Sequence, residues 1–225
     1  MEKCIKDIEH VHAFELLSND EEKLLNNNKS TILYNKGEIV MKQAAFANNI
    51  LYIKSGLCKV YIEGEAKNII LTLKPEKTFM GISSLYYDKN LYLYSASALE
   101  DCEINLYDKN AFKEILNNNT AFSNEIIKYL NHNSARIFSR ILCIAEKNAR
   151  GKVADMLLCF ANNLFGCYDF IIPLSRQELA EFAGLSMENT IRILKEFEKD
   201  NLISLNGKEM HIINIEALER ISQFG

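Results

Sequence analysis

The sequence of 225 residues predicts an α+β protein with an N-terminal antiparallel β domain, one long helix and a C-terminal winged helix-turn-helix. Residues 31–108 contain short runs rich in Ile, Leu, Val and Tyr, separated by glycines, as in small sandwiches or barrels. After residue 109 apolar residues recur every three to four positions, which indicates helices. Near the C-terminus, two helical segments precede an Asn206-Gly207 pair between apolar runs, a strong hairpin signal.

The composition is that of a folded chain. Hydrophobic residues make up 48% and charged residues 25%, so the sequence does not predict disorder. The length allows two domains with cores of their own. The first ten residues, MEKCIKDIEH, interleave charges with apolar residues, and no stretch approaches the ~20 apolar residues of a membrane span. We therefore expect a cytoplasmic protein with no secretory signal and no membrane partner.

The six cysteines are scattered singly, without a CxxC pair or the Cys/His spacing of a zinc finger, so no metal site is predicted. Most are expected to be reduced and buried as small hydrophobic residues. They are Cys4, Cys58, Cys102, Cys143, Cys159 and Cys167.

The β domain is predicted to cover residues 1–118 and to begin with a short helix. Ser18 is its expected N-cap, and the acidic residues that follow lie in its first turn, where the helix dipole favours negative charge. The segment IEGEAK at 62–67 is a hairpin candidate. Four glycines punctuate the strands: Gly37, Gly56, Gly64 and Gly81.

Residues 119–147 predict a long helix with two apolar faces. A second face, which includes Phe122, Ile127 and Leu142, gives it more apolar surface than a helix needs to cover its own domain alone. A fully buried core helix would explain both faces, but we favour one face on the β domain and one on a second copy of the chain. The polar Asn133 would fix the register of that homodimer. The predicted dimer seam has heptad-like spacing: Ile126, Leu130, Asn133, Ile137, Ile141 and Ile144.

The C-terminal domain is predicted over 148–225, after a polar break at 147–151, and starts with an amphipathic helix at 148–166. Ser175 and Glu178 form an S-x-x-E capping box that begins the next helix. Gly184 then supplies a tight turn. The helix that follows is expected to bury Thr190, Ile191, Leu194 and Phe197.

The outer face of this last helix carries the candidate functional residues. A solvated surface helix would explain its polarity. In a winged helix-turn-helix, however, the second helix enters the major groove of DNA. There Arg192 can donate to guanine and Glu188 can accept from cytosine, and these two residues, four apart, can also pair with each other.

The charge of the chain argues against binding DNA by bulk attraction. The net charge is −4, and from residue 149 onward acidic residues outnumber basic ones. Because phosphate neutralisation supplies much of the affinity for DNA, a monomeric domain of this charge would bind weakly. A homodimer would double the contacts and set two half-sites about one helical turn apart.

The segment LSRQELAEFAGLSMENTIRILKEFEKDNLISLNGKEMHI closely resembles the helix-turn-helix of the cyclic-AMP receptor protein and fumarate-nitrate regulator (Crp/Fnr) superfamily of bacterial transcription factors. The resemblance covers nearly the whole chain, and it implies a cyclic-nucleotide-binding-like β-roll (jelly roll), a dimerisation helix and a winged DNA-binding domain. It also implies a homodimer on a palindromic operator in double-stranded DNA, and contact with RNA polymerase if the protein is an activator.

The resemblance also implies roles for single residues. Glu188 and Arg192 stand at positions that read base edges in the family, and Ser186 at one near the DNA backbone. Met187 stands where the cyclic-AMP branch has an arginine and resembles the fumarate-nitrate branch, so half-sites with a TGA-like core, nearer to TTGA, are expected. The complete expected DNA-binding set is Arg176, Gln177, Ser186, Met187, Glu188, Asn189, Arg192 and Lys195.

The segment FMGISSLYYDKNLYLYSASA at 79–98 occupies the place of the family's phosphate-binding cassette. The positions that hold the nucleotide in the family align here with Ile82, Tyr92 and Leu93, which cannot bind a ribose or a phosphate. Cyclic AMP or GMP is therefore not expected. Tyrosines such as Tyr87 and Tyr94 suit a pocket for a small apolar or aromatic effector. Alternatively, they alternate along a strand, so that half lie in the core and half in solvent and none forms a pocket. The expected effector residues are Met80, Ile82, Tyr86, Tyr92, Leu93, Ile137 and Phe138.

Other modes of control stay open from the residues alone. An iron-sulfur cluster is not expected, because Cys4 stands alone near the N-terminus. Control by haem would need a side chain that binds the haem iron as an axial ligand. A regulator that acts without an effector would need no such residue. No cofactor is predicted, and haem is not excluded. The candidate haem ligands are His10, His12, His132, Cys58 and Cys102.

Two other functional classes fit the sequence less well. No GxSxG, Walker loop or HExxH motif is present, so an enzyme is not expected. A protein-interaction module would explain the long helix but would leave Gly184, Ser186 and Arg192 without a role.

Overall fold

The computed structural model describes residues 12–65 and 67–225, so Cys4 and His10 lie outside the described residues. The chain divides into two compact units, and the main boundary falls between Ile137 and Phe138, inside helix α3 (Thr120–Glu146). Residues 67–70 are grouped with the C-terminal unit, and the rest of the described chain before Phe138 forms the N-terminal unit. Sequence reasoning placed the break after this helix, at 147–151. The last turns of α3 belong to the C-terminal unit, where Ile144 lies against Gly184.

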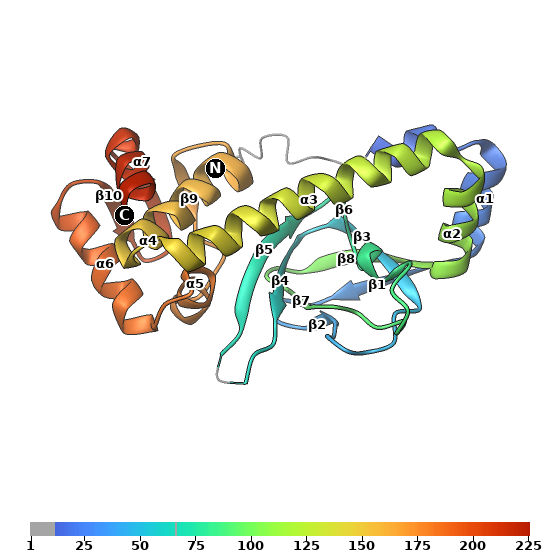
Figure 1. Ribbon diagram of the computed structural model, residues 1–225, viewed down its shortest axis with the longest axis horizontal. Helices are drawn as coiled ribbons and strands as arrows, with labels where there is room; N and C mark the ends of the chain where they lie inside the picture. Colours follow the sequence, from blue (N-terminus) through green and yellow to red (C-terminus); the bar gives the residue numbers. More distant parts are fainter. Residues whose placement is uncertain (1–11, 66) are drawn as a thin grey trace. The chain divides into compact units, whose positions relative to one another are not determined.

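Two four-stranded sheets form the described N-terminal unit (Figure 1). The first has the order β1-β8-β3-β6, and all of its neighbours are antiparallel. The second has the order β2-β7-β4-β5, in which β4 and β5 flank the predicted hairpin segment and are neighbours. The strands are β1 (Lys29–Tyr34), β2 (Ile39–Met41), β3 (Asn49–Ser55), β4 (Leu57–Ile62), β5 (Ile69–Pro75), β6 (Thr78–Met80), β7 (Ser95–Ala98) and β8 (Cys102–Asp108).

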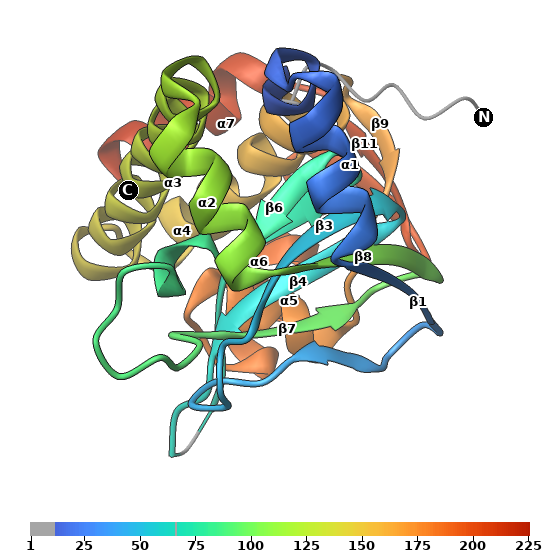
Figure 2. The ribbon, with the colours of Figure 1, turned by 90° about the vertical axis from the view of Figure 1, so that its right-hand side faces the viewer.

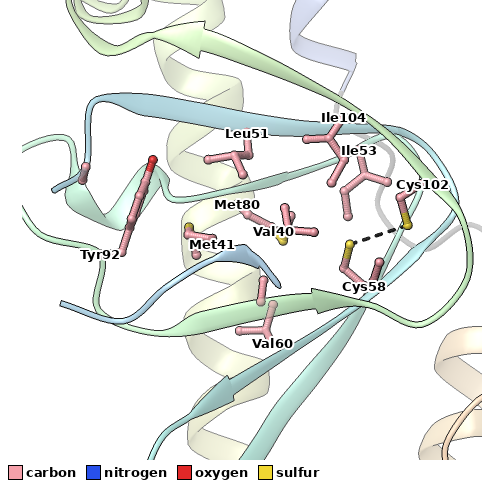
Figure 3. Close-up of a cluster of buried hydrophobic side chains, with 13 residues drawn as sticks. Val40, Met41, Leu51, Ile53, Cys58, Val60, Met80, Tyr92, Cys102 and Ile104 are labelled. Carbon is pink, nitrogen blue, oxygen red and sulfur yellow. Dashed lines mark hydrogen bonds between the residues drawn. The ribbon is translucent and has the colours of Figure 1, made fainter. Parts of the chain in front are cut away.

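Apolar side chains from both sheets meet in a core between them (Figure 3). Met41, Leu51 and Met80 lie near its centre, and Cys58 and Cys102 lie together at one end with their sulfur atoms 3.9 Å apart. Both cysteines, like Cys143 in the other unit, are free and buried, as predicted.

The helices of the N-terminal unit cover a second, aromatic core. They are η1 (His12–Leu16), α1 (Asn19–Asn27), the short η2 (Ile82–Ser84), α2 (Lys109–Asn118) and the first part of α3. The predicted cap of α1 is confirmed, because Ser18 Oγ accepts from the Glu21 N–H and Glu21 Oε2 accepts from the Ser18 N–H at 2.8 Å. Figure 2 shows α1 beside α2. Phe79, Phe112 and Phe122 are fully buried beneath these helices.

The C-terminal unit joins a helical bundle to a three-stranded sheet of order β10-β11-β9. The predicted helix at 148–166 is α4 followed by the π-helical turn η3, and sequence reasoning did not identify β9 or α7. The elements are α4 (Ala149–Cys159), η3 (Phe160–Phe165), β9 (Asp169–Ile171), α5 (Arg176–Ala183), α6 (Met187–Lys199), β10 (Ile203–Asn206), β11 (Glu209–Ile212) and α7 (Ile215–Phe224). Throughout the described residues, every helix is too short or too polar to cross a membrane.

Candidate functional site

Local signals position the two helices of the helix-turn-helix as predicted. Ser175 Oγ accepts from the Glu178 N–H at 3.3 Å, and Glu178 Oε2 accepts from the Ser175 N–H at 2.7 Å, which completes the capping box of α5. Gly184 ends α5 with a φ of +68°, a left-handed conformation that favours glycine. Ser186 then caps α6 by accepting from the Asn189 N–H.

The inner face of α6 differs from the prediction by one residue. Ile193 is fully buried, whereas Ile191 is only half-buried. The buried positions Thr190, Ile193, Leu194 and Phe197 follow the i, i+3, i+4, i+7 pattern of one helix face, and Ile191 lies on its flank. The assignment of Ile191 to the core was therefore wrong.

The outer face of α6 carries an arginine that is hydrogen-bonded to two neighbours on the same helix. Arg192 Nη2 donates to Asn189 Oδ1 at 2.6 Å, and Nη1 donates to Glu196. The predicted pair of Arg192 with Glu188 was wrong, because Glu196, which Arg150 also holds at 2.8 Å, takes its place. Met187, Glu188, Arg192 and Lys195 are exposed, and Asn189 is half-buried.

The wing lies beside the start of α5. β10 and β11 pair so that Asn206 faces Glu209, which puts Gly207 and Lys208 at the two central turn positions rather than the predicted Asn206-Gly207. Gly207 has a φ of +62°, as the first central residue of a type II′ turn requires. Arg176 Nη2 donates to the Gly207 carbonyl at 2.9 Å and so ties α5 to the wing. Gln177 and Ser186 are exposed.

A cavity of about 120 Å³ lies within the N-terminal unit. Strands β4, β5 and β6, the turn η2 and helix α3 supply its walls. The apolar lining residues are Val60, Leu71, Phe79, Ile82, Leu130 and Ile137, and the polar ones are Thr72, Lys74, Ser83, Tyr94, Tyr129, Asn133, Ser134 and Arg136.

A hydrogen-bonded cluster forms one wall of this cavity. Lys74 is only 8% exposed, and its Nζ donates to the Tyr129 hydroxyl at 3.0 Å and to Asn133 Oδ1. Tyr129 Oη in turn donates to the Phe79 carbonyl at 2.6 Å, and Asn133 Nδ2 donates to the Tyr129 carbonyl at 2.9 Å. The ammonium group thus has a fixed position at the cavity wall.

The hydroxyl of the half-buried Tyr94 forms part of another wall. Tyr94 Oη accepts a hydrogen bond from the Gly81 N–H at 2.9 Å, and the side chain of Ser83 lies next to the same hydroxyl. Burial raises the pKa of Tyr94 to about 12, although the hydrogen bond from Gly81 opposes this shift. Tyr94 therefore presents a neutral hydroxyl at physiological pH.

Comparison with known proteins covers both units. Residues 31–119 match the cyclic nucleotide-binding domain, and residues 151–221 match the Crp-like helix-turn-helix domain. The chain belongs to the Crp/Fnr superfamily. It is a transcriptional regulator whose C-terminal unit carries a DNA-binding helix-turn-helix.

Several relatives of this Crp/Fnr regulator match it over most of their length. The anaerobic regulatory protein of Bacillus subtilis (strain 168) is 25% identical over 85% of this chain and 83% of its own. The transcriptional activator protein anr of Pseudomonas aeruginosa is 25% identical over 80% of this chain and 75% of its own. The structure of FixK2 from Bradyrhizobium japonicum has the same fold, with a TM-score of 0.77 and 16% identity over 86% of this chain and 96% of that one.

Few of the predicted effector residues line the cavity of this Crp/Fnr regulator. Ile82 and Ile137 line it. Met80 and Tyr92 lie in the core between the sheets, where Tyr92 Oη donates to the Asn49 carbonyl. The remaining three, Tyr86, Leu93 and Phe138, are exposed, and Tyr86 borders a separate pocket.

Neither Tyr92 nor Leu93, two of the predicted cassette positions, lines the cavity. Tyr94, which sequence reasoning named as a pocket tyrosine, lines the cavity together with Ile82. Leu93 lies in the loop before β7 and is exposed.

The predicted dimer seam mostly faces the chain's own units. Ile126 is 2% exposed within the aromatic core, and Leu130 packs against that core. Asn133 binds Lys74, and Ile144 lies against Gly184. Among the six seam residues only Ile141 is widely exposed. The structure excludes Ile126 from the seam, because this residue is fully buried in its own unit, and for the five half-buried or exposed members the seam stays a prediction.

A face of α3 that adjoins the predicted seam carries exposed apolar residues, and the seam residue Ile141 is one of them. Ile127 is 54%, Phe138 65%, Ile141 53% and Leu142 56% exposed. Three of these are from the second apolar face that sequence reasoning identified, whereas Phe122 from that face is fully buried.

Sequence reasoning missed the cationic wall of the cavity. Tyr129 and Asn133 are four residues apart, so they share a helix face, and this spacing was the available signal. Lys74 had none, because its partners lie more than fifty positions away. The described haem candidates His12, His132, Cys58 and Cys102 do not line the cavity.

Proposed function

We propose that this regulator binds a two-fold symmetric operator as a homodimer, with helix α6 in the major groove. The observation that carries the proposal is the exposed outer face of α6, on which Arg192 is held by Asn189 and Glu196. A preoriented guanidinium suits the two acceptors of a guanine edge.

The neighbouring residues determine the expected half-site. Glu188 is exposed one turn before Arg192 and can accept from a cytosine amino group. Met187 offers an apolar surface of the kind that contacts a thymine methyl group. Arg176, Gln177 and Ser186 contact the DNA backbone, and the half-sites have a TGA-like core nearer to TTGA.

The dimer contact in this proposal is the exposed apolar face of α3. Ile127, Phe138, Ile141 and Leu142 recur at helical spacing, and a second copy would remove them from water. The regulator acts in the cytoplasm and contacts RNA polymerase where it activates.

The effector in this proposal occupies the cavity beside α3 and is not a cyclic nucleotide. Ile82 and Tyr94 at the cassette offer no carboxylate for a ribose, and a cavity of about 120 Å³ is small for a nucleotide. Cyclic AMP is expected to leave the melting temperature and the operator affinity unchanged.

A fluorescence titration tests the DNA-binding proposal. The probes are a duplex with two inverted TTGA half-sites and a scrambled duplex of the same composition, at one fixed salt concentration. The regulator is expected to bind the first at least about a hundredfold more tightly. Equal affinity for both duplexes would contradict sequence-specific binding.

A further inference from the structure

We infer that Cys58 and Cys102 form a redox-active pair, which closes into an intramolecular disulfide when hydrogen peroxide oxidises it. The basis is a contact between two free thiols from different sheets. Their sulfur atoms lie 3.9 Å apart at one end of the core of the N-terminal unit (Figure 3). Neither residue lines the cavity or belongs to the helix-turn-helix, so the site does not depend on the proposed function.

The strand connections bring the two thiols together. The chain passes from β3 in one sheet to β4 in the other through Gly56 alone, and from β7 back to β8 through residues 99–101. The end of β3 pairs with the start of β8, which places both connections at one corner. Cys58 is the second residue of β4 and Cys102 the first of β8. The sheets converge at this corner, although packed sheet faces usually lie about 10 Å apart.

Gly56 leaves the space that the sulfur atom of Cys102 occupies. Its φ of +99° is a left-handed conformation that favours glycine, and a Cβ atom there would lie 2.6 Å from Cys102 Sγ. A side chain at this position would collide with the Cys102 thiol. The glycine of this turn thus permits the contact between the two sulfur atoms.

The two thiols need only a short movement to bond. An S–S bond is about 2 Å long, so the sulfur atoms must approach each other by roughly 2 Å. Rotation about χ1 between staggered rotamers moves a cysteine sulfur atom by a comparable distance. Because Cys58 and Cys102 are both buried, a bulky external thiol cannot compete with the neighbouring one.

Cys102 is the thiol that reacts first. It follows the exposed Asp101, so a local opening of residues 99–101 would admit a molecule as small as hydrogen peroxide. The hydrogen bond between the thiols lowers the pKa of Cys102, against the opposing effect of burial, and raises the pKa of Cys58. Because the thiolate is the nucleophile, Cys102 attacks the oxidant and Cys58 then attacks the oxidised sulfur.

Hydrogen peroxide takes two electrons from the pair. The Cys102 sulfur attacks one peroxide oxygen, the O–O bond breaks, and the departing hydroxide leaves as water with the thiol proton. Cys58 then attacks the sulfenic acid: the S–S bond forms, the S–O bond breaks, and a second water leaves with the Cys58 proton. Two thiols and one peroxide thus give one disulfide and two water molecules.

Tryptic peptide mapping of the full, folded chain without reductant tests the pair directly. After treatment with millimolar hydrogen peroxide and alkylation of the remaining thiols, residues 55–59 are expected to be linked to residues 90–109. The linked mass is the sum of the two peptides less two hydrogen atoms, and dithiothreitol is expected to release both. Peptides that stay separate, whether alkylated or further oxidised, or a linkage of either to another cysteine, would overturn the inference.

The variant Cys58→Ala removes the thiol that completes the bond. It is expected to lose the linkage completely and to accumulate the sulfenic acid of Cys102, which dimedone then labels. Cys143→Ala is the matched control, because Cys143 is also free and buried but lies in the C-terminal unit. A folded Cys143→Ala variant that loses the linkage would contradict the assignment to this pair. The mapping of the unmodified chain needs no variant to fold.

Discussion

Arg192 is the residue on which the proposed base recognition depends most. Replacing it with alanine removes both hydrogen bonds to one guanine, so we expect a loss of ~1–3 kcal/mol in discrimination at that base pair. Titrations of the operator and of operators substituted at single positions would measure this loss. Lys199→Ala, on the exposed last turn of the same helix, is the charge-matched control. An equal loss on operator and scrambled DNA would show that Arg192 contacts phosphate instead.

Asp155 is expected to make the stability of the C-terminal unit depend on pH. Burial raises its pKa, but hydrogen bonds from Lys147, Cys143 and Ser222 and the positive charge of Lys147 outweigh this and hold the pKa below the ordinary value. The carboxylate therefore stabilises the fold above its unfolded pKa, and this contribution is lost as the pH falls through the lowered folded value.

Asp155→Asn is expected to lower the free energy of unfolding at pH 7 by about 1–3 kcal/mol and to flatten its acidic pH dependence. Denaturant unfolding between pH 7 and pH 3 measures both effects. Asp169→Asn, an exposed carboxylate of the same unit, is the control. A variant curve that stays parallel to that of the unmodified chain would refute the role of Asp155.

Among the elements, those with local signals were predictable from the sequence. The capping boxes of Ser18 and Ser175, the turn at Gly184 and the hairpin around Gly207 each depend on a few neighbouring residues. The short strand β9 lacks such a signal, because it is stabilised by its pairing with β11.

The faces of α3 and the effector cavity could not be predicted in the same way. Two apolar faces were visible in the sequence, but only tertiary packing shows that Ile126 faces the core and Leu142 faces solvent. Lys74 reaches Tyr129 and Asn133 across the fold. Such long-range contacts leave no periodic trace in one sequence.

The exposed face of α3 carries a prediction about assembly. Leu142→Glu places a charge in the proposed dimer contact and is expected to raise the dimer dissociation constant by about tenfold or more. Analytical ultracentrifugation over a concentration series would measure this constant. Ser139→Glu adds the same charge at an exposed position off the apolar face. Equal effects of the two substitutions would exclude this face as the contact.

The whole chain is acidic, yet it has to bind the polyanion DNA. A net charge of −4 provides little non-specific attraction, so a single C-terminal unit is expected to bind weakly. Two copies joined through α3 would engage two half-sites, and the second contact then occurs at high effective concentration. Specific geometry and dimerisation together would supply the affinity that charge does not.

The most direct test of this account is a titration of the full chain against two duplexes of equal length, one with two inverted half-sites and one with a single half-site. Removing one half-site is expected to weaken binding by about a hundredfold, and the logarithm of the affinity for the intact site is expected to fall linearly with the logarithm of the salt concentration. Equal affinity for the two duplexes would contradict the claim that this regulator reads its operator as a dimer.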